Sequence, residues 1–482
     1  MLIPDQLDLI AGRSARPQET TDVILCHPDT GDALTEGLAT ATDQVDAALA
    51  SADQLHQSGG WFDLDVDAKS AALTRFAHAL EAISADLAVP ESINTGIPIS
   101  VTQPMTSGVA GFLHGAAEQV RASTERAMDG RHGATVLHRL PFGPAVVIAP
   151  WNAPSPSIVG KSAAAMAAGC PVIVKPSEWA PGTADLVATA AMEAELPPGL
   201  FQLVHGGAAV GAQLVADRRS RVVVFTGGQP AGRAIAAAAA PNFARLQLEL
   251  GGNNPAIVCA DADIAATARS LADGATKLNG QWCEAPGRIL VEASVADDLR
   301  DALLTELARR RIGSCLDPDT EIGPLSHQLH HQKVTAAVQA LDSRADTEVH
   351  RVGELPDLGG WFFPPTLITG IAANESLSET FGPVMTLHSV ADEQAALAAA
   401  SVGDDGLAAY VFSADTERAM ALGARLRAGE VKVNGTGLFD LCGDSEQSFW
   451  GASGIGGHGD ATTFELFRGS RIVGVDDANA PM

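Results

Sequence analysis

GPAVVIAPWNAPSPSIVGKSAAAMAAGCPVIVK, residues 143–175, contains two short apolar runs separated by a stretch of small residues. The runs 144–150 and 171–175 are rich in Val and Ile, which is typical of strands buried on both faces. Residues 157–168, between the runs, are mainly small and suit a helix packed closely on a sheet. A strand, a helix and a second strand in this order predict two parallel strands joined by a crossover helix.

The same alternation continues along the chain. Further strands are predicted at 200–204, 221–225, 246–250, 256–259, 288–292, 382–387, 407–412 and 430–434, and further helices at 181–193, 209–216, 229–239, 264–277 and 296–310. Gly251 and Gly252 interrupt the pattern, and paired glycines let the backbone turn freely. We therefore predict an α/β fold with two parallel-sheet domains that divide near Gly251.

Composition excludes several classes of partner. The 482 residues include 58 acidic and 31 basic side chains, giving a net charge of −27, which disfavours binding to nucleic acid or to anionic membranes. The first 17 residues contain Asp5 and Asp8 and no long apolar run, so a secretory signal is not expected. Six cysteines without a C-x-x-C pair indicate reduced thiols, and we expect a cytoplasmic protein.

Three polar residues follow or end predicted strands. Cys283, in NGQWCEAPGR at 279–288, is either a nucleophile whose thiolate is favoured by backbone amides or a buried spectator. Glu249, in LQLELGG at 246–252, is either a base with a raised pKa or an edge-strand acid facing water. Asn152, in PWNAP at 150–154, is either an amide donor at a ligand site or a simple turn residue.

Seven short motifs in order along nearly the whole chain resemble the aldehyde dehydrogenase superfamily. They are Pro150-Trp-Asn152, Lys175-Pro-Ser-Glu178, Phe225-Thr-Gly227, Glu249-Leu-Gly-Gly252, Gly280-Gln-Trp-Cys283, Ile322-Gly-Pro-Leu325 and Glu379-Thr-Phe381-Gly-Pro-Val384. Each motif is weak alone, but seven in this order are specific. The resemblance implies a Rossmann-like cofactor domain, a catalytic domain and a small β oligomerisation element.

The resemblance also implies catalytic roles. Cys283 would attack an aldehyde carbonyl to form a thiohemiacetal, and the Asn152 amide with the Cys283 backbone N–H would form the oxyanion hole. Loss of hydride to a nicotinamide would leave a thioester. Glu249 would then activate water to release a carboxylic acid, as in the hydrolytic members of the family.

The resemblance also implies which residues bind the cofactor. Lys175 and Glu178 match residues that hold the adenosine ribose, and a carboxylate there favours NAD over NADP, although NADP is possible. Thr226, Gly227 and Gly228 precede a predicted helix whose N-terminus would bind the pyrophosphate; the family usually has serine at position 228. The remaining matches are Glu379 and Phe381, at the nicotinamide, and Trp151, in the cofactor groove.

The chain departs from the family around the expected substrate channel. Trp282 and Glu284 flank the nucleophile, Lys277 stands where an aromatic is common, and Glu284 is expected to turn toward Arg288. The other expected channel residues are the small Ala153 and Gly160 and the aromatic Phe439 and Phe449. We expect Trp282 to fill space left by the small residues, giving a channel suited to a medium-sized or aromatic aldehyde.

Domain boundaries follow from the same resemblance. Residues 1–121 and 141–251 are assigned to the dinucleotide-binding domain, 252–466 to the catalytic domain, and 122–140 with 467–482 to the oligomerisation element of a homodimer or homotetramer.

Two further motifs are given no role. The run GIGGHG at 454–459 fits a dinucleotide fingerprint but lacks a βαβ unit, so we interpret it as a flexible loop. His327, His330 and His331 could share a helical face, which we interpret as solvated, and no metal is expected. The alternatives to the main hypothesis are an NADP-preferring enzyme, an acyl-transferring enzyme of coenzyme A type and a non-catalytic paralogue.

Overall fold

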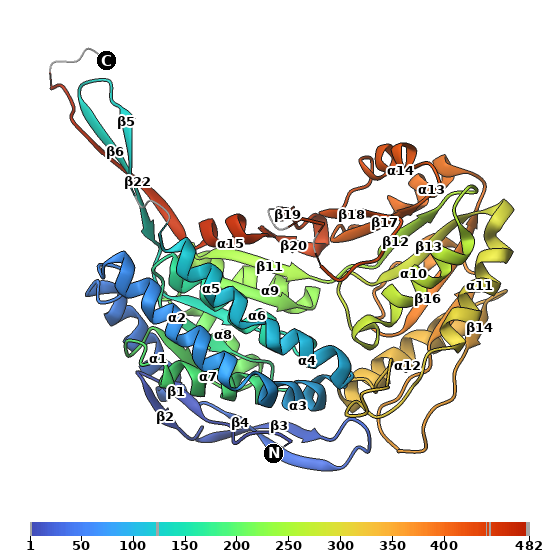
Figure 1. Cartoon of the computed structure of the whole chain (residues 1–482), viewed down its shortest axis with the longest axis horizontal. Coiled ribbons are helices and arrows are strands. Elements are labelled where there is room, and N and C mark those ends of the chain that lie inside the picture. Colours follow the sequence, from blue (N-terminus) through green and yellow to red (C-terminus); the bar gives the residue numbers. More distant parts are fainter. Residues whose placement is uncertain (1, 122–124, 440, 443–444, 479–482) are drawn as a thin grey trace.

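Two large sheets form the framework of the computed structural model, which describes residues 2–121, 125–439, 441–442 and 445–478 (Figure 1). The first sheet contains, in spatial order, β2 (Arg13–Ala15), β1 (Asp8–Ile10), β9 (Phe201–Leu203), β8 (Val172–Lys175), β7 (Ala145–Ile148), β10 (Val222–Gly227), β11 (Arg245–Leu250) and β20 (Gly454–Ile455). The strands from β9 to β11 are parallel, and the edge strands are antiparallel. The strand–helix–strand prediction from residues 143–175 is therefore confirmed.

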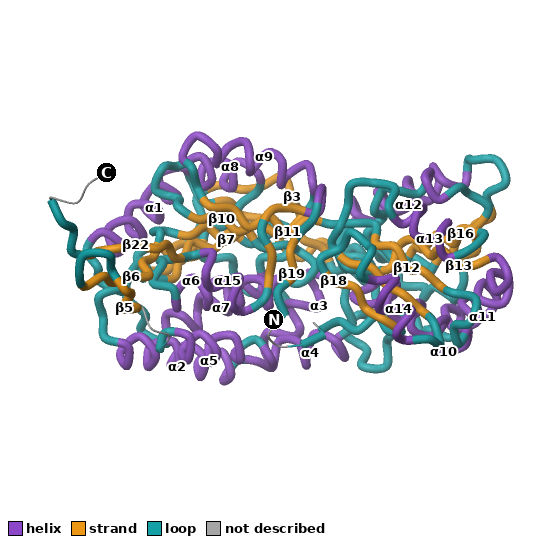
Figure 2. Tube along the Cα trace, turned by 90° about the horizontal axis from the view of Figure 1, so that it is seen from above, coloured by secondary structure: helices purple, strands orange, loops and turns teal. Residues whose placement is uncertain are grey.

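Helices cover both faces of the first sheet, as Figure 2 shows from above. One face packs against α6 (Pro154–Ala167) and α7 (Gly182–Glu193). On these two helices pack α2 (Val66–Ala82), α3 (Ser84–Thr95) and α5 (Ala110–Gln119). The other face packs against α1 (Thr42–Gln57), α8 (Ala208–Ala216) and α9 (Gln229–Ala239). Alternate residues of β7 point into the two cores, since Val147 belongs to the first and Val146 to the second. A strand buried on both faces explains the uninterrupted apolar run in the sequence.

The second sheet begins just after Gly251 and Gly252. Its order is β14 (Glu348–Arg351), β15 (Thr366–Thr369), β16 (Val384–Val390), β13 (Pro286–Glu292), β12 (Asn254–Val258), β17 (Ala408–Phe412) and β18 (Glu430–Val433). All its pairings are parallel except that of β14. Its helices are α10 (Ile264–Thr276) and α11 (Ala296–Ala308) on one face, α13 (Glu393–Ala400) and α14 (Thr416–Gly423) on the other, and α12 (Gln328–Asp342) beside β15.

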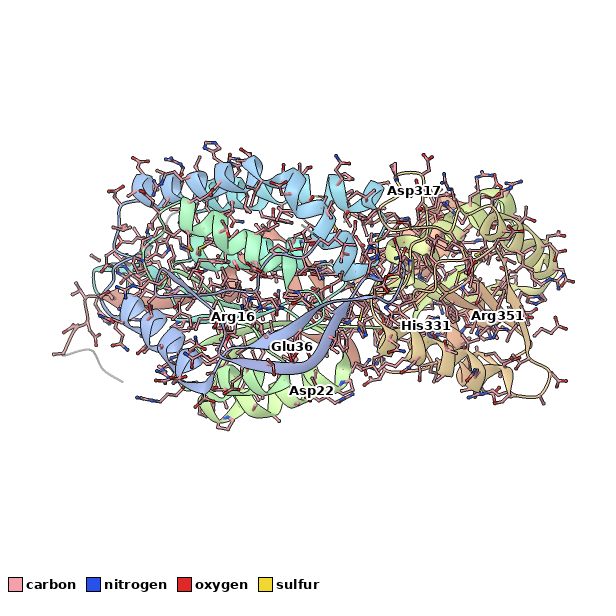
Figure 3. All side chains as sticks on the ribbon, turned by 90° about the horizontal axis from the view of Figure 1, so that it is seen from below. Arg16, Asp22, Glu36, Asp317, His331 and Arg351 are labelled. Carbon is pink, nitrogen blue, oxygen red and sulfur yellow. The ribbon has the colours of Figure 1, made fainter. Side chains whose placement is uncertain are left out.

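A two-stranded ribbon connects the two α/β units. β3 (Glu19–Cys26) and β4 (Ala33–Ala39) pair antiparallel, and Figure 3 shows the ribbon that carries Asp22 and Glu36 running along the surface toward His331. At its turn, the Asp29 carboxylate accepts hydrogen bonds from the Ser314 hydroxyl and the Cys315 N–H, at 2.5 and 3.0 Å. The ribbon therefore fixes the second unit to the first.

A three-stranded arm projects from the first unit (Figure 1). It consists of β5 (Glu125–Asp129), β6 (Ala134–Pro141) and β22 (Arg468–Gly474), in the order β22-β6-β5. The residues 122–124 and 479–482 of the predicted oligomerisation element lie outside the described residues. Among the described residues, no helix combines the length and the apolar character needed to cross a bilayer.

The glycine-rich run GIGGHG is ordered, so its interpretation as a flexible loop is wrong. Gly454–Ile455 forms β20, which pairs with β11, and Gly457–His458 forms β21, which pairs with β19 (Gln447–Ser448). The helix that follows, α15 (Asp460–Leu466), packs on α6. Glycine is required here because a Cβ on Gly454 would lie 1.7 Å from the Leu248 carbonyl oxygen. The segment 454–466 thus packs on the first unit, through β11 and α6.

One further α-helix and five 3₁₀ turns complete the secondary structure of the described residues. α4 (Ile99–Gly108) follows α3, and the 3₁₀ turn η2 (Lys277–Gly280) precedes the nucleophile candidate. The remaining 3₁₀ turns are η1 (Ala240–Asn242), η3 (Ala293–Val295), η4 (Ala373–Glu375) and η5 (Gly451–Ser453).

Candidate active site

A cavity of about 720 Å³ lies at the carboxyl ends of β7, β8, β10 and β11, where open parallel sheets bind ligands. Residues from the second unit close it, including Cys283, Glu379 and Phe381. It brings together all of the predicted catalytic and cofactor residues: Trp151, Asn152, Lys175, Glu178, Thr226, Gly227, Gly228, Glu249, Cys283, Glu379 and Phe381.

Cys283 lies on a tightly held turn between η2 and β13. Leu278, Asn279 and Gly280 have positive φ angles of 49°, 59° and 75°, an unusual run for residues with side chains. The Asn279 amide stabilises it by donating to the carbonyls of Gly96 and Pro324, at 2.8 and 2.9 Å. After the nucleophile, Asn254 Nδ2 donates to the Cys283 carbonyl at 2.9 Å. The backbone that presents the sulfur is thus fixed from both sides.

Cys283 and Glu249 face each other. The Cys283 Sγ lies 3.9 Å from Glu249 Oε1, so the thiol can donate a hydrogen bond to this carboxylate. Burial raises the pKa of Cys283 well above its ordinary value, and the charges of Glu249, Glu284 and Glu379 raise it further. Burial and the three carboxylates therefore act against the thiolate that backbone amides are expected to favour.

The Glu249 carboxylate has the opposite shift from the one expected. Burial acts to raise its pKa, but interactions with His458, Lys161 and Thr226 outweigh that effect, and the pKa is lowered. Thr226 stands opposite Glu249 in the parallel pairing of β10 and β11, which explains their contact. Glu249 is therefore an ionised acceptor at neutral pH, ready to take a proton.

Asn152 reaches the nucleophile turn from the end of β7. It is buried, and its Nδ2 donates to the Gln281 carbonyl at 2.8 Å, two residues before Cys283. The start of α6 is held by the buried Glu91, whose Oε1 accepts from both the N–H and the hydroxyl of Ser155, at 3.2 and 2.8 Å. The PWNAP motif indicates Asn152, but no local pattern indicates Glu91 or the network that places it.

Lys175 and Glu178 lie together at the end of β8. The buried Lys175 ammonium donates to the carbonyls of Pro176 and Gly206, at 2.8 and 2.5 Å, and lies 3.8 Å from Glu178 Oε2. Burial lowers the pKa of Lys175, while Glu178 opposes that shift. A Cβ on Gly207 would lie 3.6 Å from Glu178 Oε1, so the absence of a side chain at Gly207 leaves this carboxylate open to the cavity.

The turn between β10 and α9 forms another wall of the cavity. Gly228 is the N-cap of α9, Pro230 occupies its first turn, and a Cβ on Gly228 would meet little besides the Pro230 ring, at 3.8 Å. At Gly227 a Cβ would lie 2.5 Å from the Phe225 ring, so a side chain here would displace that ring. An α-helix N-terminus with an unobstructed backbone suits a phosphate group.

Glu379 and Phe381 line the opposite wall. A Cβ on Gly251 would lie 1.9 Å from Glu379 Oε2, which shows how closely this carboxylate approaches the backbone between the two sheets. Burial and, to a lesser degree, the charge of Asp405 raise the pKa of Glu379 to about 8. Phe381 has a φ of 58°, and its carbonyl accepts a hydrogen bond from His330 Nε2 at 2.7 Å.

The three histidines of α12 do not form a solvated face, so that interpretation is wrong. His330 is buried against Trp151, with ring centroids 4.8 Å apart, and His327 stacks on Trp179 at 3.9 Å. Burial lowers the pKa of His327 to about 3 and that of His330 to about 4, so both rings are neutral at pH 7. Both line the cavity, and their position directly after the Ile322–Leu325 motif was a signal that sequence analysis did not use.

Glu284 turns away from Arg288, contrary to expectation. Its carboxylate lies 3.6 Å from Lys432 Nζ and accepts from Gln447 at 3.3 Å. Arg288 instead donates to backbone carbonyls, including that of Asn253 at 3.2 Å. Lys432 is therefore the cation that compensates the acid beside the nucleophile.

The predicted channel residues are spread over several environments. Trp282 is buried with Ile97 and Leu278, and the ammonium groups of Lys277 and Lys432 each lie 5.9 Å from its ring centroid. Gly160 lies beside Phe112, whose ring a Cβ would meet at 3.5 Å, and Ala153 is the N-cap of α6. Phe439 is 85 % exposed, whereas Phe449 is buried against the His458 ring at 5.6 Å.

The fold and the site together indicate a class of enzyme. A cysteine thiol, a facing carboxylate and an amide donor stand at the end of a glycine-lined groove between two α/β units, an arrangement that suits a dinucleotide-linked enzyme acting through a covalent thiol adduct.

Comparison with known proteins identifies the family. Residues 15–473 match the model of the aldehyde dehydrogenase family, and the chain belongs to it. It is 32% identical over 440 residues to geranial dehydrogenase of Castellaniella defragrans, covering 90% of this chain and 92% of that protein.

Solved structures of other proteins share the fold of this chain. Betaine aldehyde dehydrogenase of Staphylococcus aureus, determined in complex with NAD+, has a TM-score of 0.92 at 26% identity, covering 97% of this chain and 94% of that one. HpcC of Thermus thermophilus has a TM-score of 0.93 at 30% identity, covering 99% and 95%. The predicted fold class is thereby confirmed.

Proposed function

We propose that this enzyme oxidises an aldehyde to a carboxylic acid with reduction of NAD. The observation that supports it most strongly is the contact between Cys283 and Glu249 at the end of the glycine-lined cavity, with Sγ and Oε1 3.9 Å apart. Family membership and the NAD+ complex of the related betaine aldehyde dehydrogenase agree with it.

The residues present fit the cofactor. The groove has a carboxylate at Glu178 for ribose hydroxyls and open glycines before α9 for phosphate, and Glu379 and Phe381 would hold the nicotinamide end beside Trp151. When bound, NAD supplies the acceptor for the hydride that leaves the aldehyde carbon.

The chain's own residues perform the remaining steps. The Cys283 thiol loses its proton to solvent, and its Sγ forms a bond to the aldehyde carbon. Negative charge develops on the carbonyl oxygen, where the Asn152 amide and the Cys283 N–H would stabilise it; one such donor contributes about 3–4 kcal/mol. After oxidation to the thioester, Glu249 takes a proton from water, whose oxygen attacks the carbonyl carbon, and the C–S bond breaks to release the acid.

The domain roles and assembly belong to the same proposal. Residues 1–121 and 141–251 bind the dinucleotide, 252–466 carry the nucleophile, and 122–140 with 467–482 mediate a homodimer or homotetramer. The arm supports the last assignment, since Ile472, Val473 and Val475 are more than half exposed on it. The six free cysteines fit a cytoplasmic location.

The substrate class follows from the surroundings of the sulfur. Trp282, Ile97 and Leu278 form an apolar cluster with Cys283 at its margin, and we propose a medium-sized or aromatic aldehyde. Ala153, Gly160, Phe439 and Phe449 remain proposed channel residues.

A panel of aldehydes assayed with each nicotinamide tests the function. We expect absorbance at 340 nm to rise with NAD+ and an apolar aldehyde, and one acid molecule to form per NADH without coenzyme A. A requirement for coenzyme A would favour the acyl-transferring alternative, and absence of NADH with every aldehyde would contradict the proposal.

Replacement of Glu178 by glutamine is expected to shift cofactor preference toward NADP. The substitution removes the charge that repels a 2′-phosphate and weakens the bond to ribose hydroxyls. Hydrogen bonds to charged groups contribute about 1.5–3 kcal/mol, so the NAD to NADP ratio of kcat/KM should fall on the order of 10- to 100-fold. Glu193→Gln, on the exposed end of α7, is the matched control; an unchanged ratio in Glu178→Gln would place the ribose elsewhere.

A further inference from the structure

Three metal-ligating side chains converge on the surface of the first unit, on the neighbouring helices α2 and α5. His78 and Glu81 lie one turn apart near the end of α2, and His114 lies on α5. Each residue offers one ligand atom, and the three ligand atoms lie within 4.8 Å of one another. None of the three residues lines the cavity of the candidate active site. They therefore form a separate cluster, outside the proposed catalytic and cofactor-binding residues.

The packing of the two helices fixes the backbone beneath this cluster. α2 and α5 lie side by side (Figures 1 and 2). At the start of α2, Asp67 pairs with Arg121, which follows α5. Near the end of α2, Glu81 pairs with His114. The helices are thus antiparallel, and both contribute side chains to the same buried core. Rotation of exposed side chains is therefore the only movement needed to bring the ligand atoms around an ion.

The separations between the ligand atoms suit a tetrahedral ion. Zinc binds histidine nitrogen at about 2.0–2.1 Å and carboxylate oxygen at about 2.0–2.2 Å, which places two ligands of a tetrahedral site roughly 3.4 Å apart. His114 Nε2 lies 2.8 Å from Glu81 Oε1, and no pair in the cluster exceeds 4.8 Å. The rings of His78 and His114 have centroids 5.7 Å apart. Since the side chains of His114 and Glu81 are 41 % and 49 % exposed, small rotations can equalise these separations.

The donor types indicate which ion would bind. Two imidazoles and one carboxylate form a three-ligand zinc set that leaves a fourth position for water. Imidazole favours transition metals, whereas Ca²⁺ and Mg²⁺ prefer sites built from oxygen. Gly111 and Gly115 flank His114 on α5, and a Cβ on either would meet no atom within 4 Å. The surface beside the cluster is thus open to the water that would complete the coordination.

The electrostatic surroundings favour a cation. His78 and Glu81 lie at the C-terminal end of α2, which carries the negative end of the helix dipole. Lys69 and Arg75, the basic residues of α2, donate to backbone carbonyls of other segments, and α5 contains no Lys or Arg. Glu118 is exposed one turn beyond the α5 histidine, and the whole chain has a net charge of −27.

We propose that His78, Glu81 and His114 form a binding site for a divalent transition-metal ion, of which Zn²⁺ fits the donor set best. The bound ion joins the end of α2 to α5 and restrains both helices. On binding, the contact between His114 Nε2 and Glu81 gives way to two bonds to the ion, and a proton on Nε2 passes to solvent or to Nδ1 of the same ring. The inference goes beyond the proposed function and does not depend on it.

Equilibrium dialysis of the full-length protein against Zn²⁺ tests the site, with the cysteines alkylated beforehand because thiols compete for zinc. We expect one Zn²⁺ per chain with a Kd on the order of 10 µM, weaker than closed four-ligand sites because water holds one position. His78→Gln and His114→Gln should each raise the Kd by at least about 100-fold, since loss of even an outer-shell partner costs 10- to 100-fold. His350→Gln is the matched control, because it removes a histidine that lies 3.5 Å from a single carboxylate, that of Glu348. This control should bind zinc like the native protein.

Hydrogen exchange then distinguishes a restraint on the helices from loose surface binding. Zn²⁺ should slow amide exchange in residues 66–82 and 110–119 of the native protein, and should have no such effect in the double variant His78→Gln/His114→Gln. Absence of stoichiometric binding to the native protein, or equal affinity in the native protein and both single variants, would refute the site. Binding without slower exchange would refute the restraint. Neither measurement uses an aldehyde or NAD, so failure of the proposed function would be seen separately, in the aldehyde assay.

Discussion

Replacement of Cys283 by alanine should reduce NADH formation by a factor on the order of 10⁵ or more, to the level of the uncatalysed reaction. The reason is that no covalent adduct can form, and loss of a nucleophile removes the contribution of the base and the oxyanion donors with it. Cofactor binding should persist, because the groove is formed by other residues. The measurement is absorbance at 340 nm together with a fluorescence titration of NADH.

The exposed Cys442 provides the matched control. Cys442→Ala should retain native activity, and mass spectrometry of the native enzyme quenched during turnover should locate the acyl adduct at position 283. Retention of more than one hundredth of native activity in Cys283→Ala would contradict the covalent mechanism.

The substitution Glu249→Gln should separate the two halves of the reaction. Glutamine is nearly isosteric but cannot accept a proton, so water attack on the thioester should slow by about 10²- to 10⁴-fold. We expect a burst approaching one NADH per active site followed by very slow turnover. In the native enzyme the lowered pKa of Glu249 should keep this step active until the pH falls below the ordinary carboxyl value of 4.5.

Hydroxylamine, a nucleophile that needs no general base, tests whether the acyl group accumulates on the variant. Hydroxylamine should release the acyl group from Glu249→Gln as a hydroxamate and restore continuous NADH formation. Glu465→Gln, on α15, serves as the control for loss of a carboxylate. Absence of both the burst and the hydroxylamine effect would mean that Glu249 acts before the thioester forms, as acceptor of the thiol proton.

Sequence predicted the framework because its strongest signals are local. Buried parallel strands are continuous apolar runs, and β7, β8 and β10 lie within two residues of the ranges expected. Polar residues at the ends of such strands must converge at one edge of the sheet, which is why Asn152, Glu178 and Glu249 share one cavity.

The protonation states could not be predicted, because they depend on residues distant in sequence. The pKa of Glu249 is lowered by His458, more than 200 positions away, and the pKa of Cys283 is raised partly by Glu379. Nothing within 279–288 indicates that Lys432, rather than Arg288, compensates Glu284. Likewise the run GIGGHG has no apolar alternation that would predict a strand. Gly454–Ile455 forms a strand because it pairs with the edge of the first sheet at β11.

The turn before the nucleophile also has a practical consequence for redesign. A Cβ on Gly280 would lie 2.1 Å from the Gly382 carbonyl carbon, so the backbone that presents the sulfur rests directly on the backbone that follows Glu379 and Phe381. Grafting either loop alone from a relative would create a steric mismatch with the other. Engineers who wish to alter this enzyme should exchange both segments as a single cassette.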